Sequence, residues 1–319
     1  MFTDHEVTGE LLRELRTLAE IGLRRMAART SFTPGYLSQV ENGQKPVTPA
    51  VLDAYRSVLA DPVLGLSGVD IARLQAALAD PAGAGRSSLS DISLILERTR
   101  HLEDSVGAAL VVQMVRGMDG AARALAGQRA GGRAAAGLAS EVARYRGWLE
   151  HATKRPHLAD RVLADAARLA EEATDGSQLA HALSFRAYTA RHHGNLTRAV
   201  DLTEAAIAVR DAHPILGVYD RYQRSELLAL QGRRQRAARA LHRADTAAEA
   251  AEGIELPSFG YWYTPGFWGL ERAQVLIALG RPADAIREAE MGLAALPSDH
   301  RSTDWARAML VKVDPRLAE

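Results

Sequence analysis

Residues 31–46, SFTPGYLSQVENGQKP, gather hydroxyl, amide and ammonium side chains on one short predicted helix and the turn after it. Ser38 and Gln39 carry groups that can exchange hydrogen bonds with base edges in a major groove. Lys45 can neutralise a phosphate. Pro34 and Gly35 begin the same helix and offer no side-chain hydrogen bond. The chemistry available here is noncovalent recognition of a nucleic acid.

The residues around this stretch predict two short helices joined by a tight turn. Counted from Ala27, the spacing supplies a small residue at a helix crossing, a turn hydrophobe, an N-cap, two core residues and a helix stop. These are Ala27, Phe32, Thr33, Leu37, Val40 and Gly43. Upstream, LLRELRTLAEIGLRRMAART supplies a first helix and a scaffold helix. Downstream, Thr48 is the expected N-cap of another helix that begins at Pro49.

The phrase YLSQVENGQKPVTP resembles the phage-repressor-like helix-turn-helix family, often called Xre, within residues 1–60. The resemblance implies that Thr33 caps the recognition helix and that Arg16 forms a salt bridge with Glu41. It also implies DNA contacts from the recognition helix and the turn after it, to which we add two arginines of the scaffold helix. The DNA-binding residues expected are Arg24, Arg25, Thr33, Tyr36, Ser38, Gln39, Asn42, Gln44 and Lys45.

Several positions depart from the family pattern. Gly22 replaces the usual cap of the scaffold helix, Leu23 replaces a phosphate-binding Gln, and Ser31 replaces the turn glycine. Pro34 and Gly35 replace two polar base readers, each worth roughly 1–3 kcal/mol of base discrimination. Proline is tolerated in a first helical turn, and Gly35 lets the helix N-terminus approach DNA closely. The alternative is a vestigial unit that is kept for packing or dimerisation.

Beyond residue 141 the sequence predicts helix pairs that repeat. Gly194, Gly232 and Gly280 mark turns, and alanine follows each of them by five residues, at Ala199, Ala237 and Ala285. A small residue there lets the paired helices cross closely. Residues 143–173 fit an earlier pair without the glycine. The pattern resembles tetratricopeptide (TPR) repeats with extended loops, and it predicts an α-solenoid with a concave face.

Two segments of the repeats are candidate effector sites. The stretch FGYWYTPGFW, residues 259–268, is either the floor of a ligand pocket or packing between repeats. Residues 221–243 are rich in arginine and either bind an acidic ligand or form a solvated face. If a pocket exists, arginines of 221–243 should share it with the aromatic rings. The tentative ligand-binding residues are Tyr219, Tyr222, Arg224, Tyr261, Trp262, Tyr263 and Trp268.

Composition excludes several other classes. The chain of 319 residues has a net charge of zero, so non-specific attraction to DNA should be modest. It lacks cysteine, a signal-peptide pattern and a membrane-spanning run, which favours a cytoplasmic protein. No catalytic motif, metal-ligand spacing or cofactor loop is present. We therefore expect no enzyme, cofactor or metal. Abundant arginine and alanine suggest a high-GC actinobacterial source.

These observations predict an all-α protein with three parts. Residues 1–60 form the helix-turn-helix domain, 61–140 a linker and helical connector, and 141–319 a TPR-like repeat domain; Ser90 should cap a connector helix. The expected function is transcriptional regulation by a homodimer, assembled through 91–130 or the repeats, that binds a DNA operator and senses a small ligand, peptide or protein. The alternative is a TPR-type interaction adaptor with a helix-turn-helix that no longer binds DNA.

Overall fold

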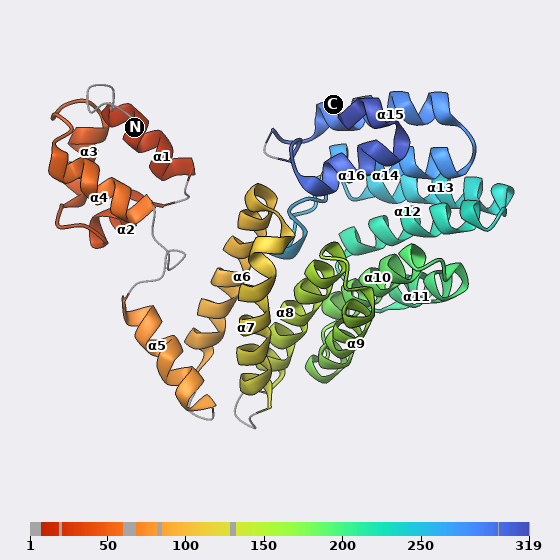
Figure 1. Cartoon of the computed structure of the whole chain (residues 1–319), viewed down its shortest axis with the longest axis horizontal. Coiled ribbons are helices and arrows are strands. Elements are labelled where there is room, and N and C mark those ends of the chain that lie inside the picture. The colour runs from red at the N-terminus through yellow and green to blue at the C-terminus, as the bar shows by residue number, and fades with distance from the viewer. Residues whose placement is uncertain are drawn as a thin grey trace. The chain divides into compact units, whose positions relative to one another are not determined.

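The computed structural model describes residues 8–18, 21–59, 68–81, 85–127, 132–298 and 300–318. Within these ranges every regular element is a helix, which confirms the all-α prediction (Figure 1). The chain divides into two compact units, residues 1–72 and 73–319. The first seven residues, on which the signal-peptide prediction rests, lie outside the described residues, as do residues 61–67, 82–84 and 128–131 of the predicted linker and connector.

The smaller unit contains four short helices: α1 (Gly9–Leu18), α2 (Leu23–Ala28), α3 (Pro34–Glu41) and α4 (Pro49–Leu59). Leu37 and Val40 of α3 are fully buried against Met26 of α2 and Tyr55 of α4. Gly9 marks a close crossing, because a Cβ there would lie 1.8 Å from the carbonyl oxygen of Val40. The core residues expected from the spacing thus fix α3 to its neighbours and leave its other face to solvent.

The larger unit consists of successive helix pairs. Helix α5 (Gly68–Ala79) spans the boundary between the units. The pairs are α6 (Arg86–Val106) with α7 (Ala108–Ala126), α8 (Gly132–Ala152) with α9 (Pro156–Ala173), α10 (Gly176–His192) with α11 (Leu196–Ala208), α12 (Pro214–Leu230) with α13 (Arg234–Ala250), and α14 (Pro265–Ala278) with α15 (Pro282–Ala295), followed by α16 (Asp304–Val313). The Ser90 cap was wrong, since α6 already begins at Arg86 after Gly85, and Ser90 lies within it.

The repeated turns have the geometry that their glycines predict. Gly194, Gly232 and Gly280 have φ of 74°, 75° and 78°, a left-handed conformation that glycine adopts without steric cost. Ala199, Ala237 and Ala285 are each fully buried where the paired helices cross. In the α8–α9 pair, Lys154 takes this turn with φ of 63°, and Ala159 is the buried crossing residue.

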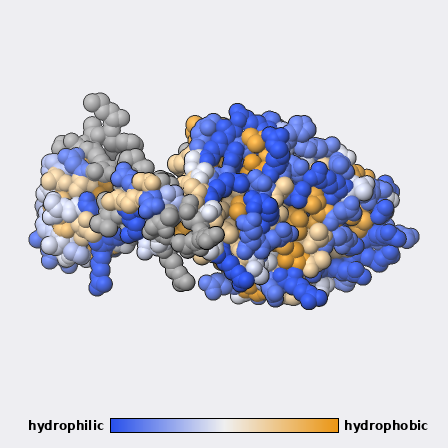
Figure 2. Space-filling view, turned by 90° about the horizontal axis from the view of Figure 1, so that it is seen from below, coloured by the Kyte–Doolittle hydropathy of each residue, from blue (hydrophilic) through white to orange (hydrophobic). Residues whose placement is uncertain are grey.

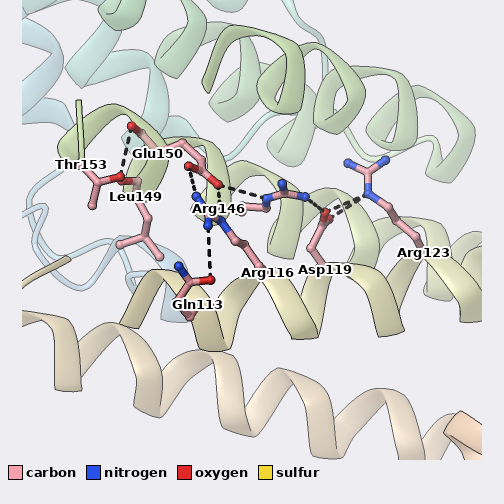
Figure 3. Close-up of polar contacts among 8 residues, drawn as sticks. All are labelled: Gln113, Arg116, Asp119, Arg123, Arg146, Leu149, Glu150 and Thr153. Carbon is pink, nitrogen blue, oxygen red and sulfur yellow. Dashed lines mark hydrogen bonds and ion pairs between the residues drawn. The ribbon is translucent and has the colours of Figure 1, made fainter. Parts of the chain in front are cut away.

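An ion-pair ladder joins α7 to α8 (Figure 3). Arg116 of α7 binds both carboxylate oxygens of Glu150 at 2.6 and 2.7 Å. Arg146 of α8 reaches back to Asp119 of α7 at 2.6 Å, and Arg123 binds the same carboxylate. Both acids are almost fully buried, so the ladder holds α7 in one register on α8. One apolar core then continues from α6 through α9.

The surface of the larger unit is mixed. In the view of Figure 2, hydrophilic residues predominate and hydrophobic residues form small patches among them. Three large apolar side chains of α6 and α7 are exposed: Leu102, Leu110 and Met114, with Leu110 at 72%. None of the described helices has the length and apolar character needed to cross a bilayer.

Candidate nucleic-acid interface and ligand cavity

A buried ion pair lies beneath the recognition helix. Arg16 of α1 binds both carboxylate oxygens of Glu41, at 2.6 and 2.7 Å, and donates a third bond to the carbonyl of Ile21. The hydroxyl of Tyr55 in α4 donates to Glu41 at 2.5 Å. Burial raises the pKa of Glu41, but the hydrogen bonds from Arg16 and Tyr55 outweigh it and lower the pKa overall. The predicted pair therefore exists, and Tyr55 is a third member that the sequence did not indicate.

The N-terminus of α3 is open to solvent. Thr33 accepts a hydrogen bond from the Tyr36 amide at 3.2 Å and caps the helix, with Pro34 in the first turn. A Cβ built on Gly35 would meet nothing within 4 Å. The remaining amides of this turn and the positive end of the helix dipole form a place where a phosphate can approach closely.

The turn after α3 folds back on the helix. The carbonyl of Gln39 accepts hydrogen bonds from the amides of Gln44 and Lys45, at 2.8 and 3.1 Å. The Lys45 ammonium then lies 4.6 Å from the centre of the Tyr36 ring. The turn thereby places Lys45 beside Tyr36, which lies in the first turn of α3.

Asn42 is held by two intramolecular contacts. Arg13 of α1 donates to its side-chain oxygen at 3.2 Å, and its amide donates to Ser38 at 3.4 Å. Nothing in the sequence indicated a role for Arg13, because only the folded structure brings this α1 side chain to Asn42 at the end of α3. Gln39 and Arg24 are exposed and Arg25 is half-buried, so the described unit presents amides and cations on its outer surface.

The larger unit contains a cavity of about 220 Å³. Its walls come from the first helix of each pair, from the segment before α14 and from α16. Tyr219, Tyr261, Trp262 and Tyr263 all line it, so four of the seven tentative ligand residues come together. The segment before α14 reaches α6, where the Tyr261 hydroxyl donates to Asp104.

Three of the tentative ligand residues do not line this cavity. Tyr222 is buried and donates to Asp245 at 2.9 Å. Trp268 is also buried and stacks on Tyr222 and Tyr263. Arg224 pairs with Glu204 in a separate basic groove between α11, α12 and α13.

The expectation that arginines of 221–243 share the aromatic pocket was therefore wrong. The arginines of the cavity are Arg100, Arg144 and Arg191, from α6, α8 and α10. The physical reason is that most of these arginines lie on α13, the outer helix of its pair, while Arg221 and Arg224 of α12 bind the Gly217 carbonyl and Glu204 instead. The aromatic segment itself combines the two interpretations, since part of it packs and part of it lines a cavity.

Burial changes the ionisation of the cavity acids. Burial raises the pKa of Glu103 to about 7, although its carboxylate accepts hydrogen bonds from Tyr145 at 2.7 Å and Trp148 at 2.9 Å. Burial also raises the pKa of Glu271. Burial and the neighbouring Arg100 lower the pKa of Arg144 to about 9, which leaves it a cation at neutral pH. No group of His, Asp and Glu suited to a metal ion occurs among the described residues.

The raised pKa of Glu103 predicts a pH-dependent effect of Glu103→Gln. A folded-state pKa of about 7 exceeds the unfolded value of 4.5, so the carboxyl favours folding at low pH and this contribution is lost as pH rises through 7. The stability of the variant relative to the natural protein should therefore increase from pH 5 to pH 8, by on the order of 1–3 kcal/mol. Urea denaturation at both pH values measures it. The exposed Glu171→Gln is the control for the loss of a carboxylate alone. A stability difference between Glu103→Gln and the natural protein that does not change with pH contradicts the prediction.

Comparison with known proteins identifies one domain. Residues 8–74 match a family model described as a helix-turn-helix domain, so the chain carries such a domain at its N-terminus. A search of curated proteins gives no match. Among solved structures, the crystal structure of Bacillus thuringiensis PlcR in complex with the peptide PapR7 and DNA is similar at 13% identity and a TM-score of 0.40, over 90% of this chain and 94% of that chain. That likeness is too loose to carry residue roles to this chain.

Proposed function

We propose that this protein is a DNA-binding transcriptional regulator of the Xre type whose helical body senses an effector through the cavity. The observation that carries the proposal is the matched helix-turn-helix domain, whose recognition helix is fixed by a buried ion pair while its polar face stays open. Packing alone does not require Gln39, Gln44 and Lys45 on that face. An actinobacterial source stays a prediction from composition.

Base contact in this proposal comes from Gln39 and Ser38, supported by Arg24 and Arg25. Because Pro34 and Gly35 supply no side-chain contact, we infer that DNA shape and a phosphate at the open N-terminus of α3 contribute much of the selectivity. With a net charge of zero, the salt dependence of binding should be shallow.

A single domain of this type binds DNA weakly, so we infer a homodimer on two half-sites about 34 Å apart. The exposed apolar residues of α6 and α7, Leu102, Leu110 and Met114, are the proposed contact between copies. An effector would change DNA affinity only if it binds the two arrangements of the dimer with different affinities.

Substitutions on α3 and its turn test DNA binding. An operator is first selected from a pool of random duplexes, and affinity is then measured by fluorescence anisotropy over a salt series. Gln39→Ala should relax base preference, whereas Lys45→Ala should weaken binding to all sequences and reduce the salt slope by about one unit. Arg168→Ala removes an exposed charge of α9, far in sequence from the helix-turn-helix domain, and serves as the control. Because the protein is proposed to bind as a homodimer, the measured stoichiometry should be two chains per duplex.

The rival function is an interaction adaptor whose helix-turn-helix domain is vestigial. The loss of base-reading side chains at Pro34 and Gly35 favours it. Failure to enrich any duplex, together with no measurable binding at low salt, would establish the adaptor and reject the regulator.

A further inference from the structure

The groove between α11, α12 and α13 carries an excess of positive charge. It has a volume of about 250 Å³, and it shares no lining residue with the aromatic cavity. Val200, Leu228 and Ala240 supply its apolar surface. A single acid, Glu204, lines it together with five arginines, so positive charges exceed negative charges by four. These arginines are Arg224, Arg233, Arg236, Arg239 and Arg243.

Four of the arginines form a row along α13. Arg236, Arg239 and Arg243 follow one another at intervals of three and four residues, which are neighbouring positions on a helix surface. Arg233, the N-cap, extends this arginine row by one turn. At a rise of about 1.5 Å per residue, the row is about 15 Å long. It therefore offers several guanidinium groups to one anion that carries more than one charge.

The chain supplies no counter-charge to the arginine row. Glu204 pairs with Arg224 of α12. The four guanidinium groups of the row are exposed and form no hydrogen bond or ion pair with any described residue. The first acid of α13 is Asp245, and its carboxylate accepts hydrogen bonds from Tyr222 and Arg272. Within the described part of the chain, no carboxylate competes with an incoming anion for these groups.

The fold gives no reason for such a row. Like charges three and four residues apart destabilise a helix, and cations near its N-terminus oppose the helix dipole. The second helices of other pairs show arginines that are compensated by an acid: Arg168 with Glu172 in α9, Arg198 of α11 with Asp160, and Arg287 with Asp284 in α15. Because the row costs α13 stability and contacts no other side chain by a polar bond, we infer a role in binding.

The chemistry of the groove selects among anions. A guanidinium binds two oxygens of a phosphate or a carboxylate at once through its planar fork of donors. One carboxylate brings a single charge, whereas one phosphate group brings about −1.5 to −2 and three acceptor oxygens. Two linked phosphates thus match the four charges of the arginine row within a small volume. The lining residues include no aromatic ring, so the groove offers nothing on which a base would stack.

We propose that this groove is a second ligand site, separate from the cavity, and that it binds a small molecule with two or more linked phosphate groups. The phosphates accept hydrogen bonds from the arginine row, and Arg224 adds a guanidinium from α12. The bound ligand joins α12 to α13 and stabilises the larger unit. The inference goes beyond the proposed function, because it requires neither DNA binding nor an effector in the cavity.

Probes of different charge and geometry test the ligand class. Orthophosphate, pyrophosphate and citrate are titrated calorimetrically into the full-length protein at neutral pH, with a chelator present and at one ionic strength, since salt screens exposed charges. Pyrophosphate should bind about tenfold or more tightly than orthophosphate, because the second phosphate adds at least one charge-assisted hydrogen bond. Citrate, which has three carboxylates, should bind no better than orthophosphate. Equal affinity of pyrophosphate and either control overturns the proposal.

A second comparison separates the sources of linked phosphates. Tripolyphosphate and ATP are titrated under the same conditions. Similar affinities support a site for the phosphate chain alone, as the lining without aromatic rings predicts, and tighter binding of ATP supports the site and identifies a nucleotide as its ligand. A glutamate-rich peptide or a random DNA duplex that binds the groove more tightly than tripolyphosphate assigns the arginine row to a macromolecule and overturns the proposal.

Variants locate the site. Arg236→Gln combined with Arg239→Gln should weaken pyrophosphate about tenfold or more. Arg161→Gln, which removes an exposed arginine of α9 outside the groove, should leave the affinity unchanged. Saturating pyrophosphate should raise the Tm of the natural protein and of Arg161→Gln, but not that of the double variant. The single variant Arg243→Gln repeats the test at a third position.

The fold of the variants can be checked without ligand. The substituted side chains are exposed, so far-UV circular dichroism should be unchanged. Relief of like-charge repulsion should leave the Tm of the double variant equal to or slightly above that of the natural protein. An unchanged pyrophosphate affinity in the folded double variant rejects the site, as does a natural protein whose Tm does not respond to pyrophosphate.

Discussion

Glu41→Ala should destabilise the helix-turn-helix unit by on the order of 3–5 kcal/mol, the cost of leaving a buried charge without its partner. The carboxylate is 3% exposed and accepts two bonds from Arg16 and one from Tyr55. After the substitution, the Arg16 guanidinium stays in place at 12% exposure with no carboxylate, and the Tyr55 hydroxyl loses its acceptor. Both losses lie between α1, α3 and α4, so the recognition helix loses its support.

The two units can be followed separately in one urea titration. All four tryptophans lie in the larger unit, so their fluorescence reports that unit, while circular dichroism reports both. We expect an earlier transition by circular dichroism and an unchanged transition by fluorescence. Glu14→Ala, an exposed change on α1, is the matched control. The double variant Arg16→Met with Glu41→Leu should recover much of the loss, because no charge remains buried; a loss below about 1 kcal/mol in Glu41→Ala would falsify the ion-pair argument.

Trp268→Ala should destabilise the larger unit by on the order of 3–5 kcal/mol through the cavity that it leaves. The ring is 8% exposed and stacks on Tyr263 with centres 5.2 Å apart and on Tyr222 at 6.1 Å. It also contacts Phe267, so its removal opens the core between α12 and α14. Thermal and urea unfolding by circular dichroism measure the loss.

Trp262→Ala is the matched control for Trp268→Ala, because it removes the same ring from a half-buried position in the cavity wall. We expect a smaller loss of stability. If Trp268→Ala retained the stability of the natural protein, the ring would not be part of the core, and its packing role would be wrong.

Much of the helix-turn-helix unit could be predicted from sequence because its signals are local. A cap at Thr33, a proline in the first turn, buried Leu37 and Val40, and a stop at Gly43 all act within one or two helical turns. The Arg16–Glu41 contact came from family resemblance, since no local rule joins residues that far apart. Tyr55 as its third member, and Arg13 beside Asn42, required the crossing of α1, α3 and α4.

Beyond residue 141 the sequence by itself determined the helix pairs, because a turn glycine with a left-handed φ and a small residue at the crossing are short-range requirements. It also indicated that residues 259–268 are important, without deciding which rings pack and which line a cavity. Only the tertiary structure decided that. The curvature of the stacked pairs brings Tyr261 to Asp104 of α6, and it places Lys312 of α16 beside Glu226 of α12. Periodicity tells which face of a helix is buried, but the partner of that face depends on small rotations between successive pairs. These rotations add up along the stack, and no single segment encodes their sum.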